Sequence, residues 1–312
     1  MKLPDFCHSP RLKWTAIIIG VVAAICVGNQ SQAEEFDGIN VTVEGKGPAL
    51  IFIPGLNSSN ETFSDTCAQF KAQYTCHLMH LPGFAGRAPL ANVEGGFLPR
   101  IRDSIENYIR TKRIDKPVLL GHSLGGFLSL MIAEHAPELP KAIVIVDSLP
   151  FYSAIQNPAA TEFTAKPYAD MTRQQLLAQA PEQYKQTSLQ MAKMSMTRLP
   201  ERVDTVVAWN LSSDRATTAQ AMYEIMTTDM RDRVANVKTP TLVLGAWAAY
   251  APYGSTKEST KAIFTTQYQK LAGVNIQMSD TGYHFLSWDD AAWVNTQIQT
   301  FLRNQNAVAT AK

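Results

Sequence analysis

The sequence predicts an α/β protein: a mostly parallel sheet with helices on both faces and an inserted helical segment. Two patterns indicate this fold class. Short apolar runs, each long enough for one strand, alternate with segments of helical periodicity, which is typical of a parallel sheet buried on both faces. The alternation stops after Asp147 and resumes at Pro240, with no convincing strand in between.

The individual elements follow from where the apolar runs begin and end. Residues 49–53 are continuously apolar and are ended by Pro54-Gly55, whereas residues 98–112 place their apolar side chains on one helical face. By the same criteria, the expected strands are 39–43, 49–53, 76–81, 117–121, 142–146, 240–244 and 274–278. The expected helices are 62–74, 98–112, 124–135, 256–272 and 291–302.

Residues 1–33 are expected to be a cleaved export signal. Lys2, Arg11 and Lys13 give a positive start, residues 14–27 are apolar, and small residues precede a cleavage after Ala33. The apolar run is short for a membrane span, so an uncleaved anchor is the alternative interpretation. The pattern predicts a periplasmic or secreted protein with no stable membrane span after cleavage.

The remaining chain is expected to form a core from residues 34–149 and 239–312, and a helical cap from residues 150–238. It carries 25 basic and 26 acidic residues and has no basic run. A nucleic-acid partner is therefore not expected. The oligomeric state stays open.

Two cysteines, Cys67 and Cys76, remain in the core. In an oxidising compartment such a pair favours a disulfide, and two separate buried thiols are the alternative. A bridge across so short a loop would stabilise the fold by about 2–3 kcal/mol.

The segment 121–125, Gly-His-Ser-Leu-Gly, points to catalysis. It follows the expected strand 117–121 and leads into the expected helix 124–135, which is the context of a nucleophile elbow. The elbow needs residues without bulk two positions before and after the serine, and Gly121 and Gly125 meet that need. Ser123 is therefore the candidate nucleophile, the alternative being a tight glycine-rich turn with an incidental serine.

A catalytic serine needs a base, and His284 is the candidate. It lies in a glycine-containing loop between the last expected strand and the last expected helix. That loop belongs at the carboxyl edge of the sheet, where Ser123 also lies. Other histidines fit structural roles better, since His122 is part of the elbow turn and His135 ends a helix. A surface histidine without function is the alternative for His284.

An oxyanion hole needs two backbone N–H groups that point at one position. The N–H of Leu124, just after the nucleophile, is the first candidate. The second comes from the loop after strand 49–53, where Leu56 is the first choice and Asn57 the second. An ordinary Pro-Gly turn is the alternative for this loop.

With these motifs, residues 36–303 resemble the α/β-hydrolase superfamily, in its variety with a helical cap between two late strands. The resemblance rests on segments 54–56, 81–86, 121–126, 240–244 and 282–285 and on the order of serine before histidine. It implies the α/β-hydrolase fold. One departure is Pro54, where many relatives have a histidine before the glycine of the oxyanion loop.

The second departure concerns the acid of the triad. Relatives usually carry it just after the strand that corresponds to 240–244, but here no carboxylate follows until Glu258. Some members place it after the strand that corresponds to 142–146, where this chain has Asp147. Asp147 is therefore the candidate acid, with Asp280 as the alternative. A structural role at the strand end is a further alternative for Asp147.

A serine at the elbow favours acyl transfer to water, so the predicted function is hydrolysis of a carboxylic ester. Three methionines at four-residue spacing in the cap, at 222, 226 and 230, favour an apolar acyl or aryl substrate. Ordinary packing of the cap helices on the core is the alternative interpretation of this pattern. The pocket candidates are Asn57, Phe151, Trp247 and Tyr250. No metal-binding or nucleotide-binding motif is present, so no cofactor is expected. The alternatives are an acyltransferase or thioesterase, a cofactor-free lyase or peroxidase, and a poorly catalytic ligand-binding protein.

Overall fold

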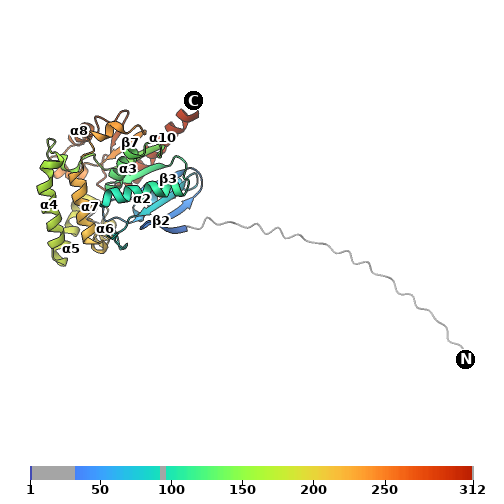
Figure 1. The fold of residues 1–312 in the computed structure, drawn as a ribbon, viewed down its shortest axis with the longest axis horizontal. Helices are drawn as coiled ribbons and strands as arrows, with labels where there is room; N and C mark the ends of the chain where they lie inside the picture. The colour runs from blue at the N-terminus through green and yellow to red at the C-terminus, as the bar shows by residue number, and fades with distance from the viewer. Residues whose placement is uncertain (2–31, 92–95, 311–312) are drawn as a thin grey trace.

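The computed structural model describes Met1 and residues 32–91 and 96–310. An eight-stranded sheet runs through this part of the chain (Figure 1), in the order β1-β2-β4-β3-β5-β6-β7-β8. The strands are β1 (Gln32–Phe36), β2 (Ile39–Gly45), β3 (Ala49–Ile53), β4 (Thr75–His80), β5 (Val118–His122), β6 (Ala142–Val146), β7 (Thr241–Gly245) and β8 (Asn275–Met278). β2 pairs antiparallel with β1 and β4, and the remaining pairs are parallel. The predicted fold class is confirmed.

Helices cover both faces of the sheet because the central strands are apolar on both sides. Ile51 and Ile53 contribute to one core cluster, whereas Leu50 and Phe52 contribute to the other. The first cluster includes residues of α2 (Phe97–Thr111), α3 (Leu124–His135) and α8 (Lys257–Gln267). The second includes residues of α1 (Ser64–Phe70) and α10 (Ala291–Thr310).

The segment between β6 and β7 is a helical insertion, and we use this name for residues 152–236. It contains α4 (Glu162–Ala178), α5 (Pro181–Met191), α6 (Pro200–Ser212) and α7 (Arg215–Thr227), together with the short helices η3 (Tyr152–Ala154), η4 (Ala192–Met196) and η5 (Arg233–Asn236). Figure 1 shows α4, α5, α6 and α7 grouped on one side of the sheet. The expected absence of strands from residues 150–238 is confirmed in this described segment.

The N-terminal prediction falls mostly outside the described residues, because the signal was placed at 1–33 and residues 2–31 are not described. Gln32 and Ala33 begin β1, a strand that the sequence did not predict, and they pair with Val43 and Thr42. Within the described residues, none of the helices combines the length and the apolar character that a membrane crossing requires.

A buried histidine connects α2 to the antiparallel edge of the sheet. His77 of β4 hydrogen-bonds through Nδ1 to the Tyr108 hydroxyl (2.9 Å), which in turn donates to Glu34 of β1 (3.1 Å). Burial lowers the pKa of His77 to about 4, although the charge of Glu34 acts in the opposite direction. Burial favours the neutral imidazole in the folded protein and has no such effect in the unfolded chain. His77 therefore makes stability depend on pH.

We predict that acid destabilises the protein partly through His77. In the unfolded chain His77 takes up a proton near its ordinary pKa of 6.5, whereas the folded protein takes it up only near pH 4. The unfolded state therefore binds more protons between these values, and stability falls as the pH drops through them. The gap corresponds to about 3 kcal/mol.

The His77→Gln variant keeps a donor for Tyr108 and removes the titration. Its free energy of unfolding, measured by urea denaturation at several pH values from about 7 to about 4, should fall less steeply than that of the wild type. Identical slopes for the two proteins would contradict this account. A residual slope is expected, since burial also lowers the pKa of His122.

Candidate active site

Ser123 occupies the sharp turn between β5 and α3. Its φ of 52° and ψ of −117° are strained for a residue with a side chain. The Ser123 N–H donates to the Val146 carbonyl (2.9 Å), and its own carbonyl accepts from the Phe127 N–H (3.1 Å). The backbone therefore holds the half-buried serine at the carboxyl end of β5, in the conformation expected of a nucleophile elbow.

The two glycines of the motif are required by close backbone approach. A Cβ at Gly121 would lie 2.1 Å from the Gly125 carbonyl oxygen, and a Cβ at Gly125 would lie 2.0 Å from the Ile53 carbonyl oxygen. Both distances are far below van der Waals contact. The steric role predicted for Gly121 and Gly125 is thus observed, and the second contact also brings the end of β3 against the elbow.

Asp147 and His284 are in direct contact. His284 Nδ1 lies 2.7 Å from Asp147 Oδ2, and Asp147 Oδ1 accepts the Ala246 N–H at 2.9 Å. Because an ionised carboxylate only accepts hydrogen bonds, Nδ1 carries the proton in this pair, and Nε2 of the neutral imidazole is left with its lone pair. This is the tautomer that a general base needs.

The sheet brings Ser123 to the same edge as this pair. β5 and β6 are parallel neighbours with His122 opposite Val146, so Ser123 and Asp147 each lie one residue beyond a paired position. The His284 ring packs on the ring of His122, with centroids 4.5 Å apart. Among the hydrogen bonds of the described residues, none joins the Ser123 hydroxyl to His284. Such bonds are often formed only when substrate is bound.

His122 supports His284, a role that sequence reasoning did not assign. Its Nε2 lies 2.9 Å from the His284 carbonyl oxygen, so Nε2–H is the donor of this bond. Burial, together with the neighbouring His284, lowers the pKa of His122 well below its ordinary value, which keeps the ring neutral. The contact spans 162 positions of sequence, and no local pattern indicates it.

The helical insertion also holds the His284 loop. The N–H groups of His284 and Phe285 donate to the carbonyls of Ser195 (3.2 Å) and Met196 (2.8 Å) in η4. Thr197, just after η4, donates its hydroxyl to Asp289 Oδ1 at 2.6 Å. The insertion therefore fixes the backbone on both sides of the imidazole.

The two candidate oxyanion donors flank Ser123. Leu124 begins α3 directly after the serine, and a Cβ at Gly55, the neighbour of Leu56, would lie 3.2 Å from Ser123 Cβ. In the part of the chain that the structure describes, the N–H groups of Leu56 and Leu124 donate to no protein acceptor. Both donors are thus available close to the serine, as a developing oxyanion requires.

The four pocket candidates take different positions. Asn57 is buried and its side chain bonds to the insertion. Phe151 is completely buried in a small cluster with three alanines. Trp247 is half-buried and donates its indole N–H to Ser279, whereas Tyr250 is half exposed. Burial and the charge of Asp147 raise the pKa of the Tyr250 hydroxyl.

The other carboxylates near His284 in sequence have other partners. Asp280 is exposed and pairs with Lys257 at 2.6 Å. Asp289 accepts the N–H groups of Tyr283 and Arg198, and Asp290 accepts the Ser279 hydroxyl. Asp147 is the carboxylate that touches the imidazole.

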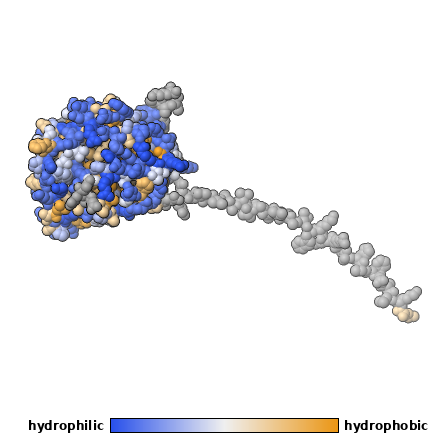
Figure 2. Space-filling view, in the orientation of Figure 1, coloured by the Kyte–Doolittle hydropathy of each residue, from blue (hydrophilic) through white to orange (hydrophobic). Residues whose placement is uncertain are grey.

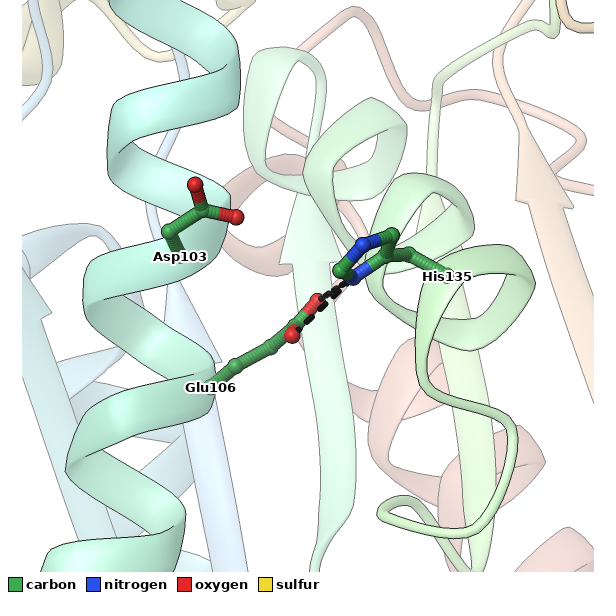
Figure 3. A group of neighbouring side chains, drawn as sticks. All are labelled: Asp103, Glu106 and His135. Atoms are coloured by element: carbon green, nitrogen blue, oxygen red, sulfur yellow. Dashed lines mark hydrogen bonds and ion pairs between the residues drawn. The ribbon is translucent and has the colours of Figure 1, made fainter.

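One group of potential metal ligands occurs among the described residues, at a distance from this site. Figure 3 shows Asp103 and Glu106 of α2 facing His135, the last residue of α3. His135 Nδ1 contacts Glu106 at 3.0 Å, and Arg102 pairs with Asp103 at 2.6 Å. With α3 rising about 1.5 Å per residue, His135 lies roughly 18 Å from Ser123. Each of the three side chains thus has a partner within the protein.

Cys67 of α1 and Cys76 of β4 lie in bridging positions. Their Cα atoms are 6.0 Å apart, a normal separation across a disulfide. The predicted bridge is therefore possible in this structure.

Comparison with known proteins gives a family match over most of the chain. The model of the alpha/beta hydrolase family matches residues 50–297. A pimeloyl-(acyl-carrier protein) methyl ester esterase of Aeromonas salmonicida is 32% identical over 118 residues, which are 37% of this chain and 44% of that protein. The chain thus spans less than half of this relative.

Solved structures resemble the fold over nearly its whole length. The enol-lactonase from Burkholderia xenovorans has a TM-score of 0.69 at 14% identity, covering 87% of this chain and all of its own. An esterase from Exiguobacterium antarcticum has a TM-score of 0.70 at 15% identity, covering 88% of this chain and all of its own. At such identities the likeness shows the fold alone.

We predict that the hydrogen bond between His284 and Asp147 is visible in solution. A proton in a short bond to a carboxylate is strongly deshielded and protected from exchange, so His284 Nδ1–H should give a far-downfield ¹H resonance. Asp147→Asn should remove or shift this resonance. Asp280→Asn, the matched control, should leave it in place. A resonance that responds to Asp280→Asn and not to Asp147→Asn would overturn the assignment.

Proposed function

Since this chain belongs to the alpha/beta hydrolase family, we propose that it hydrolyses carboxylic esters through an acyl-enzyme on Ser123. The observation that carries the proposal is the 2.7 Å contact between His284 and Asp147, at the edge where Ser123 stands in its strained turn. It gives an imidazole of the correct tautomer at the sheet edge that also carries the serine, and nucleophilic acyl transfer needs such a pair.

In the first half of the reaction, Ser123 Oγ attacks the ester carbonyl carbon and His284 Nε2 takes the serine proton. The N–H groups of Leu56 and Leu124 bind the oxyanion that forms. When the tetrahedral intermediate collapses, the bond to the alkoxy oxygen breaks and His284 passes its proton to the leaving alcohol. Asp147 holds Nδ1–H and stabilises the transient imidazolium.

In the second half, water repeats these steps on the acyl-enzyme. His284 Nε2 takes a proton from water, whose oxygen attacks the acyl carbon. The same two N–H groups bind the second oxyanion, and Ser123 leaves with the proton from His284. The products are one carboxylic acid and one alcohol, and the protein returns to its starting state.

An ester with an apolar acyl or aryl part is the proposed substrate, with the helical insertion as a cap over the site. Of the large apolar side chains exposed in the described residues, all but Met1 lie between Tyr152 and Tyr253. Figure 2 shows orange patches along the side where Figure 1 places α4 and α5. Met191 and Met194 are exposed beside the segment that holds the His284 loop. The similar proteins are named an ester esterase, an enol-lactonase and an esterase.

The proposal predicts covalent labelling of Ser123 by a fluorophosphonate probe and hydrolysis of p-nitrophenyl esters. Ser123→Ala should abolish labelling and lower kcat roughly 10⁴-fold or more, because the nucleophile is lost. Ser153→Ala, which removes a hydroxyl bonded within the insertion, is the matched control and should keep both. Esters of graded acyl length then give the preferred substrate size. An intact fold with no labelling at Ser123 would exclude a serine hydrolase.

A further inference from the structure

The side chain of Asn57 joins the oxyanion loop to the helical insertion. Asn57 is 5% exposed. Its Nδ2 donates to Asn210 Oδ1 of α6 at 3.1 Å, and its Oδ1 accepts the Thr218 hydroxyl of α7 at 2.6 Å. One buried carboxamide therefore bonds to two helices of the insertion.

The backbone of Asn57 shapes the turn that carries the proposed oxyanion donor. Its φ of 58° lies in the left-handed region, which asparagine tolerates better than most residues. Across the same turn, the Ser58 N–H donates to the Gly55 carbonyl (3.2 Å) and the Ser58 hydroxyl donates to the Leu56 carbonyl (3.2 Å). The Leu56 N–H thus belongs to a four-residue turn, 55–58, whose third residue, Asn57, is bonded to the insertion.

The first residue of this turn, Gly55, packs against the elbow at Ser123. A Cβ at Gly55 would lie 3.0 Å from His122 Nδ1 and 3.2 Å from Ser123 Cβ, so the start of the turn packs directly on the serine. Leu56 lies between Gly55, which contacts the core, and Asn57, which contacts the insertion.

We propose that Asn57 is a positioning residue that makes the oxyanion hole depend on the seating of the helical insertion. Its hydrogen bonds to Asn210 and Thr218 fix the turn in which the Leu56 N–H points at the oxyanion. The inference rests on the proposed ester hydrolysis and assigns Asn57 no contact with substrate. The insertion then does more than cover the site, because it completes the geometry that stabilises the transition state.

Two substitutions separate this role from simple packing. Asn57→Gly keeps the left-handed backbone accessible and removes the carboxamide. Thr218→Val removes the hydroxyl, which lies within hydrogen-bond distance of Asn57 and of the Asp214 carbonyl, and keeps the shape of the side chain. Thr227→Val, on the same helix and roughly 14 Å further along it, removes a hydroxyl bonded to the Tyr223 carbonyl and is the matched control.

The measurement is kcat and KM for a p-nitrophenyl ester, below the melting temperature of every variant. An oxyanion donor acts on the transition state, so kcat should fall about 10–100-fold in Asn57→Gly and about 3–10-fold in Thr218→Val, with KM changing less than about threefold. The double variant should resemble Asn57→Gly alone, because both changes break the same connection. Thr227→Val should keep the wild-type kcat.

Different results overturn different statements. A lowered melting temperature with unchanged kcat in Asn57→Gly would show a structural role only and overturn this inference. If Asn57→Gly does not fold, Thr218→Val decides, and a wild-type kcat there overturns it. Fluorophosphonate labelling of the wild type is the separate control: if Ser123 is not labelled, the proposed function itself fails. If Ser123 is labelled and the variants have a normal kcat, the proposed function stands and only the positioning role of Asn57 is overturned.

Discussion

The parallel pairing of β5 with β6 is the constraint on which the site depends. With His122 opposite Val146, both strands end at the same level, and each is followed by a non-glycine residue with positive φ, Ser123 at 52° and Asp147 at 47°. The Ser123 N–H bonds to the Val146 carbonyl and locks the two turns together. Asp147 then reaches beyond the end of β7, where the Ala246 N–H supports it, to His284 after β8. In many α/β-hydrolases the loop after this strand carries a carboxylate. In this chain the loop after β7 instead supplies the Ala246 N–H, which donates to Asp147.

The helical insertion contributes to the same geometry from the opposite side. Carbonyls of η4 hold the backbone of His284 and Phe285, and α6 and α7 hold Asn57. The core therefore places Ser123 and Asp147, while the loops that carry His284 and Leu56 are also bonded to the insertion.

Much of the fold could be predicted because continuous apolar runs mark the central strands of this chain, and one of them, 49–53, ends at Pro54-Gly55. The strand 49–53, the helix 124–135 and the strand 142–146 have the predicted bounds. β1 was missed because it is polar and overlaps the expected signal segment. Contacts between distant segments, such as His122 with His284 or Asn57 with Thr218, leave no local pattern. The catalytic roles of Ser123, His284 and Asp147 remain predictions, although the structure brings Asp147 and His284 into contact.

The most direct measurement is the mass of the protein after reaction with a p-nitrophenyl carbamate, whose carbamoyl-enzyme hydrolyses slowly. If Ser123 is the nucleophile, one p-nitrophenol is released per chain in a rapid burst. Peptide mass spectrometry should then place a single carbamoyl group on Ser123. Release of p-nitrophenol with no added mass, or with the added mass on another residue, would contradict the account.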